Sequence, residues 1–170
     1  MKIVLLGYMG SGKSTVAKLV ASHMNLQFID LDNYIAEQEK MSIPSLFKSR
    51  GEIYFRLRES DYLKDLLHDE KDLVLALGGG TPCYANNMDL IKNRSASIYL
   101  KASIPTLVER LRREKDQRPL IASFDDEKLE EFVAKHLFER RNFYDQATYS
   151  VSIDGKKVEE IAAEILTKVQ

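Results

Sequence analysis

Cysteine is nearly absent from this sequence: Cys83 stands alone among 170 residues, and there is no tryptophan. A single cysteine excludes an internal disulfide framework and a zinc site built from several cysteines, and it suits a reducing compartment. We interpret Cys83 itself as a small residue of a loop or a helix start. No apolar run approaches the roughly 18 residues of a membrane span, and no charged segment with a cleavable apolar stretch opens the chain. We therefore expect a cytoplasmic protein with no membrane partner.

Excess charge of either sign is also missing, because the chain has 25 Lys and Arg residues and 26 Asp and Glu residues, which gives a formal net charge of −1. This balance gives no electrostatic reason to expect nucleic acid as a partner, so any anionic ligand must be held by local groups. With 44% hydrophobic residues, a chain of 170 residues can build one domain with a real core and is too short for two. We expect a single domain over residues 1–170, and a monomer.

A glycine-rich run, Gly7–Thr15 (GYMGSGKST), follows directly on the apolar residues 3–6. It matches the pattern G-x-x-x-x-G-K-[ST] of a P-loop, in which glycines let backbone N–H groups cradle the phosphates of a nucleotide. Lys13 is expected to reach the β- and γ-phosphates, and Ser14 to offer its hydroxyl to Mg²⁺. The alternative is a turn that only joins a strand to a helix. The strand before the run and the helical pattern after it favour nucleotide binding.

Apolar runs alternate with helical spacing along the rest of the chain. Strands are expected at residues 3–6, around 28–29, and at 73–77, 96–100 and 149–153. Helices are expected from about residue 13 and at 33–40, 52–68, 105–113, 127–144 and 158–169, with Pro44 interrupting the pattern. Near-continuous apolar strands separated by helices predict a three-layer α/β fold, with a central parallel five-stranded sheet and helices on both faces. Ligands then bind at the carboxyl ends of the strands.

Two sequence features fall at these strand ends. Asp30 and Asp32 close the second strand, where residues two apart point to the same side, toward the P-loop. One of them has a structural alternative, since Asp32 could cap the turn that begins at Asn33. The triplet Gly78-Gly79-Gly80 follows the third strand. Three glycines cost conformational entropy, so a close approach of a ligand to the backbone explains them better than a flexible turn does.

Arginines occur at three further places: Arg56 and Arg58, Arg118, and Arg140 and Arg141. Taken singly, each is more often a surface ion-pair partner than a ligand contact. Guanidinium groups nevertheless suit carboxylate and phosphate, and a phosphoryl-transfer site needs positive charge around the migrating group. The polar stretch that joins two expected helices carries Arg118. We interpret residues of about 114–126 as a mobile lid that brings this arginine over the phosphates.

In their order along the chain, these segments resemble the shikimate kinase family over essentially the full length. The matching parts are Gly7–Thr15, Asp30-Leu31-Asp32, Gly51-Glu52 with Phe55-Arg56, Leu77–Gly80, Arg118-Pro119-Leu120, and Arg140 with Tyr144. The resemblance implies a P-loop kinase fold. It also implies ATP-dependent phosphorylation of the 3-hydroxyl of shikimate, a step toward chorismate and the aromatic amino acids.

The resemblance also implies a role for each matching residue. Shikimate would be bound by Asp32, Arg56, Gly79 and Arg140, with a helical substrate-binding segment at about 32–60. ATP would be bound by Gly10, Ser11, Gly12, Lys13, Ser14, Thr15 and Arg118. The metal ion, Mg²⁺, would be held by Ser14, with Asp30 nearby and contacting it through water. The catalytic residues would be Lys13, Asp32 and Arg118.

Two assignments within the resemblance stay open. The residue beside adenine is Lys156 or Lys157, and a further arginine on the lid side is Arg112 or Arg113. The chain also departs from the family at positions 142–143, where members often have proline and leucine.

Other functions remain as alternatives. Gluconate kinases and nucleoside monophosphate kinases share the P-loop, the sheet and the lid, but Leu77–Gly80 together with Phe55-Arg56 favours shikimate. A nucleotide-dependent switch that engages a protein partner belongs to another class. The sequence shows no exposed apolar motif or appended segment devoted to such a partner.

Overall fold

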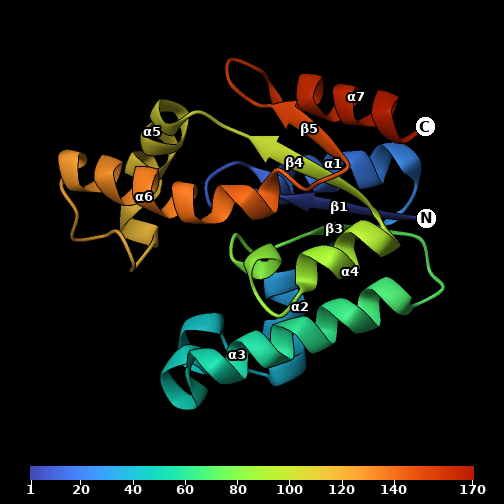
Figure 1. Ribbon diagram of the computed structural model, residues 1–170, viewed down its shortest axis with the longest axis horizontal. Helices are drawn as coiled ribbons and strands as arrows, with labels where there is room; N and C mark the ends of the chain where they lie inside the picture. The colour runs from blue at the N-terminus through green and yellow to red at the C-terminus, as the bar shows by residue number, and fades with distance from the viewer.

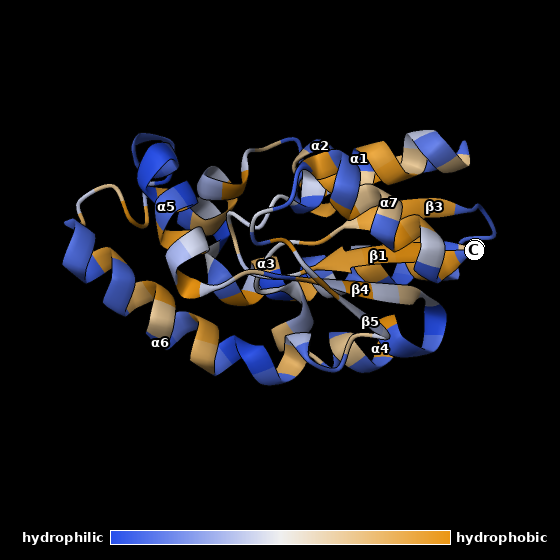
Figure 2. Ribbon diagram, turned by 90° about the horizontal axis from the view of Figure 1, so that it is seen from above, coloured by the Kyte–Doolittle hydropathy of each residue, from blue (hydrophilic) through white to orange (hydrophobic).

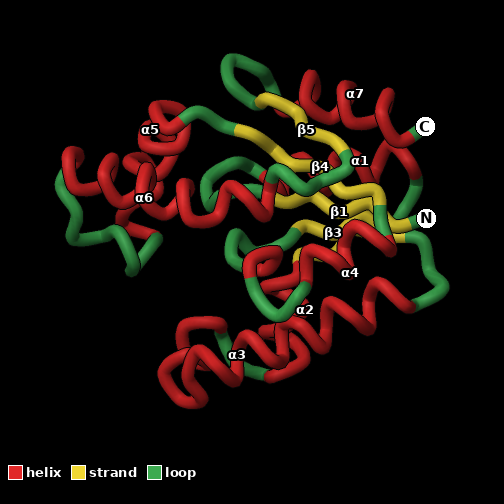
Figure 3. Tube along the Cα trace, viewed as in Figure 1, coloured by secondary structure: helices red, strands yellow, loops and turns green.

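Helices and strands alternate along the chain in the computed structural model, which describes residues 1–170 (Figures 1 and 3). The strands are β1 Lys2–Leu6, β2 Gln27–Asp30, β3 Leu73–Ala76, β4 Ala96–Lys101 and β5 Tyr149–Ser152. The helices are α1 Lys13–Met24, α2 Leu31–Glu39, α3 Ile43–His68, α4 Asn87–Arg94, α5 Ile104–Glu114, α6 Asp126–Tyr144 and α7 Val158–Val169. Two short 3₁₀ helices, η1 Thr81–Cys83 and η2 Lys115–Gln117, complete the set.

The five strands form one parallel sheet in the order β2-β3-β1-β4-β5. Figure 2 shows α1 and α7 on one side of the strands and α4 and α6 on the other, so the protein has three layers. Residues 3–6 of the central strand β1 are completely buried, which explains their unbroken apolar sequence. The predicted α/β fold is confirmed. Because all strands run in one direction, the segments that follow β1, β2 and β3 meet at one edge of the sheet.

The main difference from the predicted elements lies between α2 and α3. Pro44 does not interrupt a helix there, because it occupies the first turn of α3, where its missing N–H is not needed. Ser42 caps this turn, its hydroxyl accepting from the N–H of Ser45 at 3.3 Å. Gly51 then breaks the helical path with φ 85° and ψ 170°. The predicted start near residue 52 therefore corresponds to the second half of α3.

Helix α4 was not predicted, because its eight residues include only three large apolar side chains and give little periodic signal. None of the seven helices combines the length and the apolar character that a membrane crossing needs. Figure 1 shows α5, the segment after it and the first half of α6 standing out from the sheet at one side. This connecting segment contains the residues interpreted as a lid, and its Ile121 is completely buried.

Candidate active site

The P-loop joins β1 to α1 and wraps around the N-terminus of the helix. Gly12 precedes α1 with φ 84°, a conformation that L side chains rarely adopt. A Cβ on Gly7 would lie 2.8 Å from the carbonyl oxygen of Leu100, so this position has no room for a side chain. A hydrogen bond also links the loop to α6, because the Tyr8 hydroxyl lies 3.0 Å from Nδ1 of His136. The backbone N–H groups of this turn and the positive end of α1 therefore form a site suited to phosphate.

Lys13 opens α1 and folds back over the loop. Its Nζ donates to the carbonyl oxygens of Gly7 at 2.8 Å and Tyr8 at 2.9 Å, and the residue is buried. Burial lowers the pKa of the Lys13 ammonium to about 8, although the nearby Asp32 carboxylate opposes this shift. The ammonium is thus charged near pH 7 and is held at the mouth of the loop.

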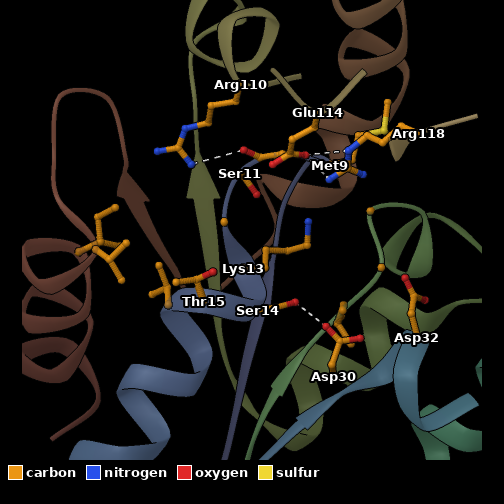
Figure 4. A pocket seen from close by; sticks show the side chains of 18 of the residues that line it. Met9, Ser11, Lys13, Ser14, Thr15, Asp30, Asp32, Arg110, Glu114 and Arg118 are labelled. Atoms are coloured by element: carbon orange, nitrogen blue, oxygen red, sulfur yellow. Dashed lines mark hydrogen bonds and ion pairs between the residues drawn. The ribbon is translucent and has the colours of Figure 1, made fainter. Parts of the chain in front are cut away.

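Asp30 ends β2 and joins two parts of the site (Figure 4). One carboxylate oxygen accepts from the Ser14 hydroxyl, and the other accepts from the N–H of Asn33 at 3.1 Å. Asp30 is therefore the N-cap of α2, and the prediction that Asp32 could be this cap is wrong. Extended backbone at Asp30 lets its side chain reach forward to the helix, whereas Asp32 already lies within the first turn.

Asp32 points toward the glycine triplet after β3. A Cβ on Gly78 would lie 3.0 Å from Oδ1 of Asp32, so the carboxylate packs against the bare backbone. Burial raises the pKa of Asp32 to about 6, and the carboxylates of Glu59 and Asp30 add to this rise. Asp32 is therefore mostly ionised at pH 7 and close to the range in which a carboxylate exchanges protons readily.

The next two glycines each face an arginine. A Cβ on Gly79 would lie 3.1 Å from Nη1 of Arg140, and one on Gly80 would lie 2.6 Å from Nη2 of Arg56. The structure thus brings Asp32 and both arginines to successive glycines of one turn, although they come from α2, α3 and α6. The sequence predicted these three side chains and Gly79 as one substrate site, and they do lie together.

Arg56 is held by a residue that the sequence analysis missed. Its Nη1 lies 2.9 Å from Oε1 of Glu59, whose other oxygen accepts from the Thr81 hydroxyl at 2.8 Å. Glu59 is only 1% exposed, so this ion pair is well shielded from solvent. The Arg56 guanidinium also lies 4.2 Å from the centre of the Tyr84 ring, while its buried Nε has no hydrogen-bond partner. The i,i+3 spacing of Arg56 and Glu59 on α3 was the one signal in the sequence.

The other candidate arginines have structural partners. Arg58 lies 3.0 Å from Glu39 and also bonds the Tyr62 hydroxyl at 2.9 Å, which ties α2 to α3. Arg141 pairs with Asp145 one turn further along α6, at 3.4 Å. Neither lies at the glycine triplet, so both act as ion-pair partners within the fold.

A cavity of about 520 Å³ opens beside the P-loop (Figure 4). Its lining includes Gly10, Ser11, Gly12, Lys13, Ser14, Thr15, Asp30, Asp32, Gly78, Gly79 and Arg118. Arg118 donates from Nε to one oxygen of Glu114 at 2.8 Å, its Nη2 lies 2.7 Å from the same oxygen in an ion pair, and Glu114 lines the cavity as well. The predicted nucleotide residues therefore surround a single cavity, with Arg118 held by a carboxylate at its rim.

The structure also bears on the residues that the sequence left open. Arg113 lines the cavity, whereas Arg112 pairs with Asp126 at 3.0 Å. Neither Lys156 nor Lys157 lines it. Arg110 also lines the cavity, although it was not predicted, and its Nη1 lies 3.4 Å from the carbonyl oxygen of Gly10. Arg110 and Arg113 stand three apart on one face of α5, which was the available signal.

The fold and the site together define a class of protein. A P-loop follows the first strand of a parallel sheet, and a carboxylate with two arginines lies beside it at the same edge. This arrangement is that of a P-loop kinase, which transfers a phosphoryl group from a nucleotide to a small acceptor.

Comparison with known proteins identifies the family. The model of the shikimate kinase family matches residues 9–170. The shikimate kinase of Flavobacterium johnsoniae is 46% identical over 166 residues, which are 97% of this chain and 96% of the relative. That of Flavobacterium psychrophilum is 44% identical over 165 residues, 96% of each protein. The chain belongs to the shikimate kinase family, whose members use ATP to phosphorylate shikimate in aromatic amino acid biosynthesis.

Solved structures agree with this assignment. The crystal structure of shikimate kinase from Bacteroides thetaiotaomicron has a TM-score of 0.91 at 34% identity, covering 99% of this chain and 98% of that one. Shikimate kinase from Acinetobacter baumannii in complex with shikimate has a TM-score of 0.87 at 31% identity, covering 99% and 92%. A gluconokinase from Sinorhizobium meliloti, covering 98% and 89%, has a TM-score of 0.63 at 18% identity and shares only the fold.

Proposed function

We propose that this site binds ATP along the P-loop and shikimate against the glycine triplet, and that the phosphoryl group passes directly between them. The observation that carries the proposal is the triplet itself. Asp32, Arg140 and Arg56 face Gly78, Gly79 and Gly80 so closely that a Cβ on any of the three would contact them at 3.1 Å or less.

The acceptor side matches the chemistry of shikimate, a small carboxylate that also carries hydroxyl groups. Arg56 and Arg140 supply two guanidinium groups for the carboxylate. The buried Nε of Arg56 has no hydrogen-bond partner, since the Glu52 carboxylate lies 4.0 Å away, so a bound anion would satisfy a donor that otherwise costs free energy. Asp32 is the group that accepts a hydrogen bond from the reacting hydroxyl and takes its proton.

The donor side neutralises charge on the phosphates. Lys13 is positioned to meet the β- and γ-phosphates, and the N–H groups at the start of α1 face the same anion. Arg118 reaches the γ-phosphate by exchanging its ion pair with Glu114 for contacts with phosphate oxygens. Both side chains of this pair are partly exposed, so the exchange gives up a weak interaction for a stronger one.

Mg²⁺ fits the residues present. No group of three or more His, Cys, Asp or Glu side chains could hold a metal on its own. Mg²⁺ at phosphate-binding sites needs only one or two protein ligands, because phosphate and water supply the rest. Ser14 and Asp30 are in contact and would hold the ion, Ser14 directly and Asp30 through water. When bound, the ion would offset the negative charge of the phosphates.

A comparison of acceptors tests this function. We expect the purified protein with ATP and Mg²⁺ to release ADP in the presence of shikimate. Gluconate and nucleoside monophosphates, tested side by side, should give no more ADP than a blank with water alone. The proposal is contradicted if saturating shikimate gives only the rate of the blank, or if one of the other acceptors is used faster.

A further inference from the structure

The three carbonyl groups of the glycine triplet, residues 78–80, are all hydrogen-bonded, but not in the same way. The first and third accept from N–H groups of the same turn, those of Thr81 at 3.2 Å and Cys83 at 2.9 Å. The second, that of Gly79, accepts from the hydroxyl of Tyr144 at 2.6 Å. Tyr144 lies 65 residues further along the chain, at the end of α6, so this bond fixes the triplet from outside.

The N–H groups of the triplet are free. None of the three donates a hydrogen bond within the chain, which leaves them available to a ligand. In a planar peptide the carbonyl and the following N–H point in opposite directions, so a bond that holds one also orients the other. The Tyr144 hydroxyl, by holding the Gly79 carbonyl, therefore sets the direction of the Gly80 N–H.

The same bond sets the distance between the triplet and Arg140. Arg140 and Tyr144 are one turn apart on α6, so their side chains lie on the same face of the helix. Nη1 of Arg140 lies 3.1 Å from the position of a Cβ on Gly79, the residue whose carbonyl Tyr144 holds. A shift of α6 away from the triplet would thus break the hydroxyl bond and move the guanidinium at once.

Tyr144 is well suited to a permanent role as donor. The residue is completely buried, and its ring centre lies 5.2 Å from that of Tyr99. Burial raises the pKa of the Tyr144 phenol well above its ordinary value, so the hydroxyl keeps its proton wherever the protein is folded. Without this donor the Gly79 carbonyl would be left without its partner.

We propose that Tyr144 is a positioning residue of the acceptor site: its hydroxyl holds the glycine triplet and Arg140 in the arrangement that binds shikimate. The inference rests on the function proposed above for this site. It gives Tyr144 no contact with the reacting atoms. Loss of the Tyr144 hydroxyl should therefore weaken shikimate binding and leave nucleotide binding unchanged.

The test compares Tyr144→Phe with Tyr99→Phe. Tyr99 is a matched control, because it is 3% exposed, packs on the Tyr144 ring and has no hydrogen bond from its hydroxyl to another residue. Loss of one buried hydrogen bond predicts a roughly two- to tenfold rise in KM for shikimate in Tyr144→Phe. KM for ATP should stay unchanged, kcat should stay within about twofold, and Tyr99→Phe should behave as the wild type.

Other outcomes would overturn the inference. One such outcome is that Tyr144→Phe and Tyr99→Phe have the same KM for shikimate. Another is that the KM for ATP in Tyr144→Phe rises as much as the KM for shikimate, which indicates a general packing defect. If Tyr144→Phe does not fold, the ¹³C shift of the Gly79 carbonyl in the wild type decides, since it must be that of a hydrogen-bonded group. If the wild type itself does not phosphorylate shikimate, the proposed function fails, and the carbonyl shift still judges the Tyr144 bond separately.

Discussion

The ionisation of Asp32 should control the activity of this protein on the acid side. Burial, with the carboxylates of Glu59 and Asp30, raises the pKa of Asp32 to about 6. A raised carboxyl pKa means that the active, ionised form is present above about pH 6 and is lost as the pH falls. At pH 7 about 90% of the molecules carry the carboxylate, and at pH 5 about 10% do. We expect kcat/KM, which reports ionisations of the free enzyme, to fall about tenfold between these values.

Asp32→Asn tests the cause of this fall, because it keeps the shape of the side chain and removes its charge. We expect kcat to fall by about 10²–10⁴, the usual contribution of a positioned base, and the remaining activity to be flat from pH 5 to 7. Asp61→Asn is the matched control, since Asp61 is an exposed carboxylate that pairs with Arg58. Initial rates of ADP release over this pH range give both profiles. A wild-type profile that stays flat down to pH 5, or an Asp32→Asn variant that keeps the acid limb, would refute the reasoning.

Three further substitutions test the remaining roles. Lys13→Met should leave the melting temperature near that of the wild type but remove most ADP release, and near-normal turnover would mean that the P-loop assignment is wrong. Arg56→Ala should raise KM for shikimate about tenfold to a hundredfold, because it removes a contact worth about 1.5–3 kcal/mol, and it should change KM for ATP little. Arg58→Ala is the control for this variant. Equal effects of the two variants on KM for shikimate would argue against a substrate contact of Arg56. Arg118→Ala should lower kcat more than it weakens ATP binding. Hydrogen exchange at residues 114–126 should slow when an ATP analogue and shikimate bind, and unchanged exchange would argue against a lid.

Much of the fold could be predicted because its inner strands, β1, β3 and β4, are largely buried. Residues 3–6 and 73–76 are continuous apolar runs, and in a parallel sheet such runs can only be interior strands. Helix α4 and the bend at Gly51 could not be predicted in the same way. Helix α4 is short and mostly polar, and a single glycine does not tell whether a helix ends, bends or continues.

The site was predicted as far as single residues carry recognisable chemistry. Lys13, Asp32 and the glycine triplet belong to local patterns that are typical of a phosphate or ligand site at the end of a strand. The supporting contacts could not be predicted, because they depend on how distant helices pack. Tyr144 reaches the Gly79 carbonyl only because the end of α6 lies against the turn after β3, and no local pattern records that approach.

The central claim is that this site places the γ-phosphate of ATP on the 3-hydroxyl of shikimate. The most direct measurement follows the phosphoryl group itself, with ATP labelled at the γ-position and the product analysed by ³¹P and ¹H NMR. We predict that the label appears in a shikimate ester whose phosphorus couples to the proton on carbon 3. Label found in inorganic phosphate alone, or on another oxygen of shikimate, would contradict the account.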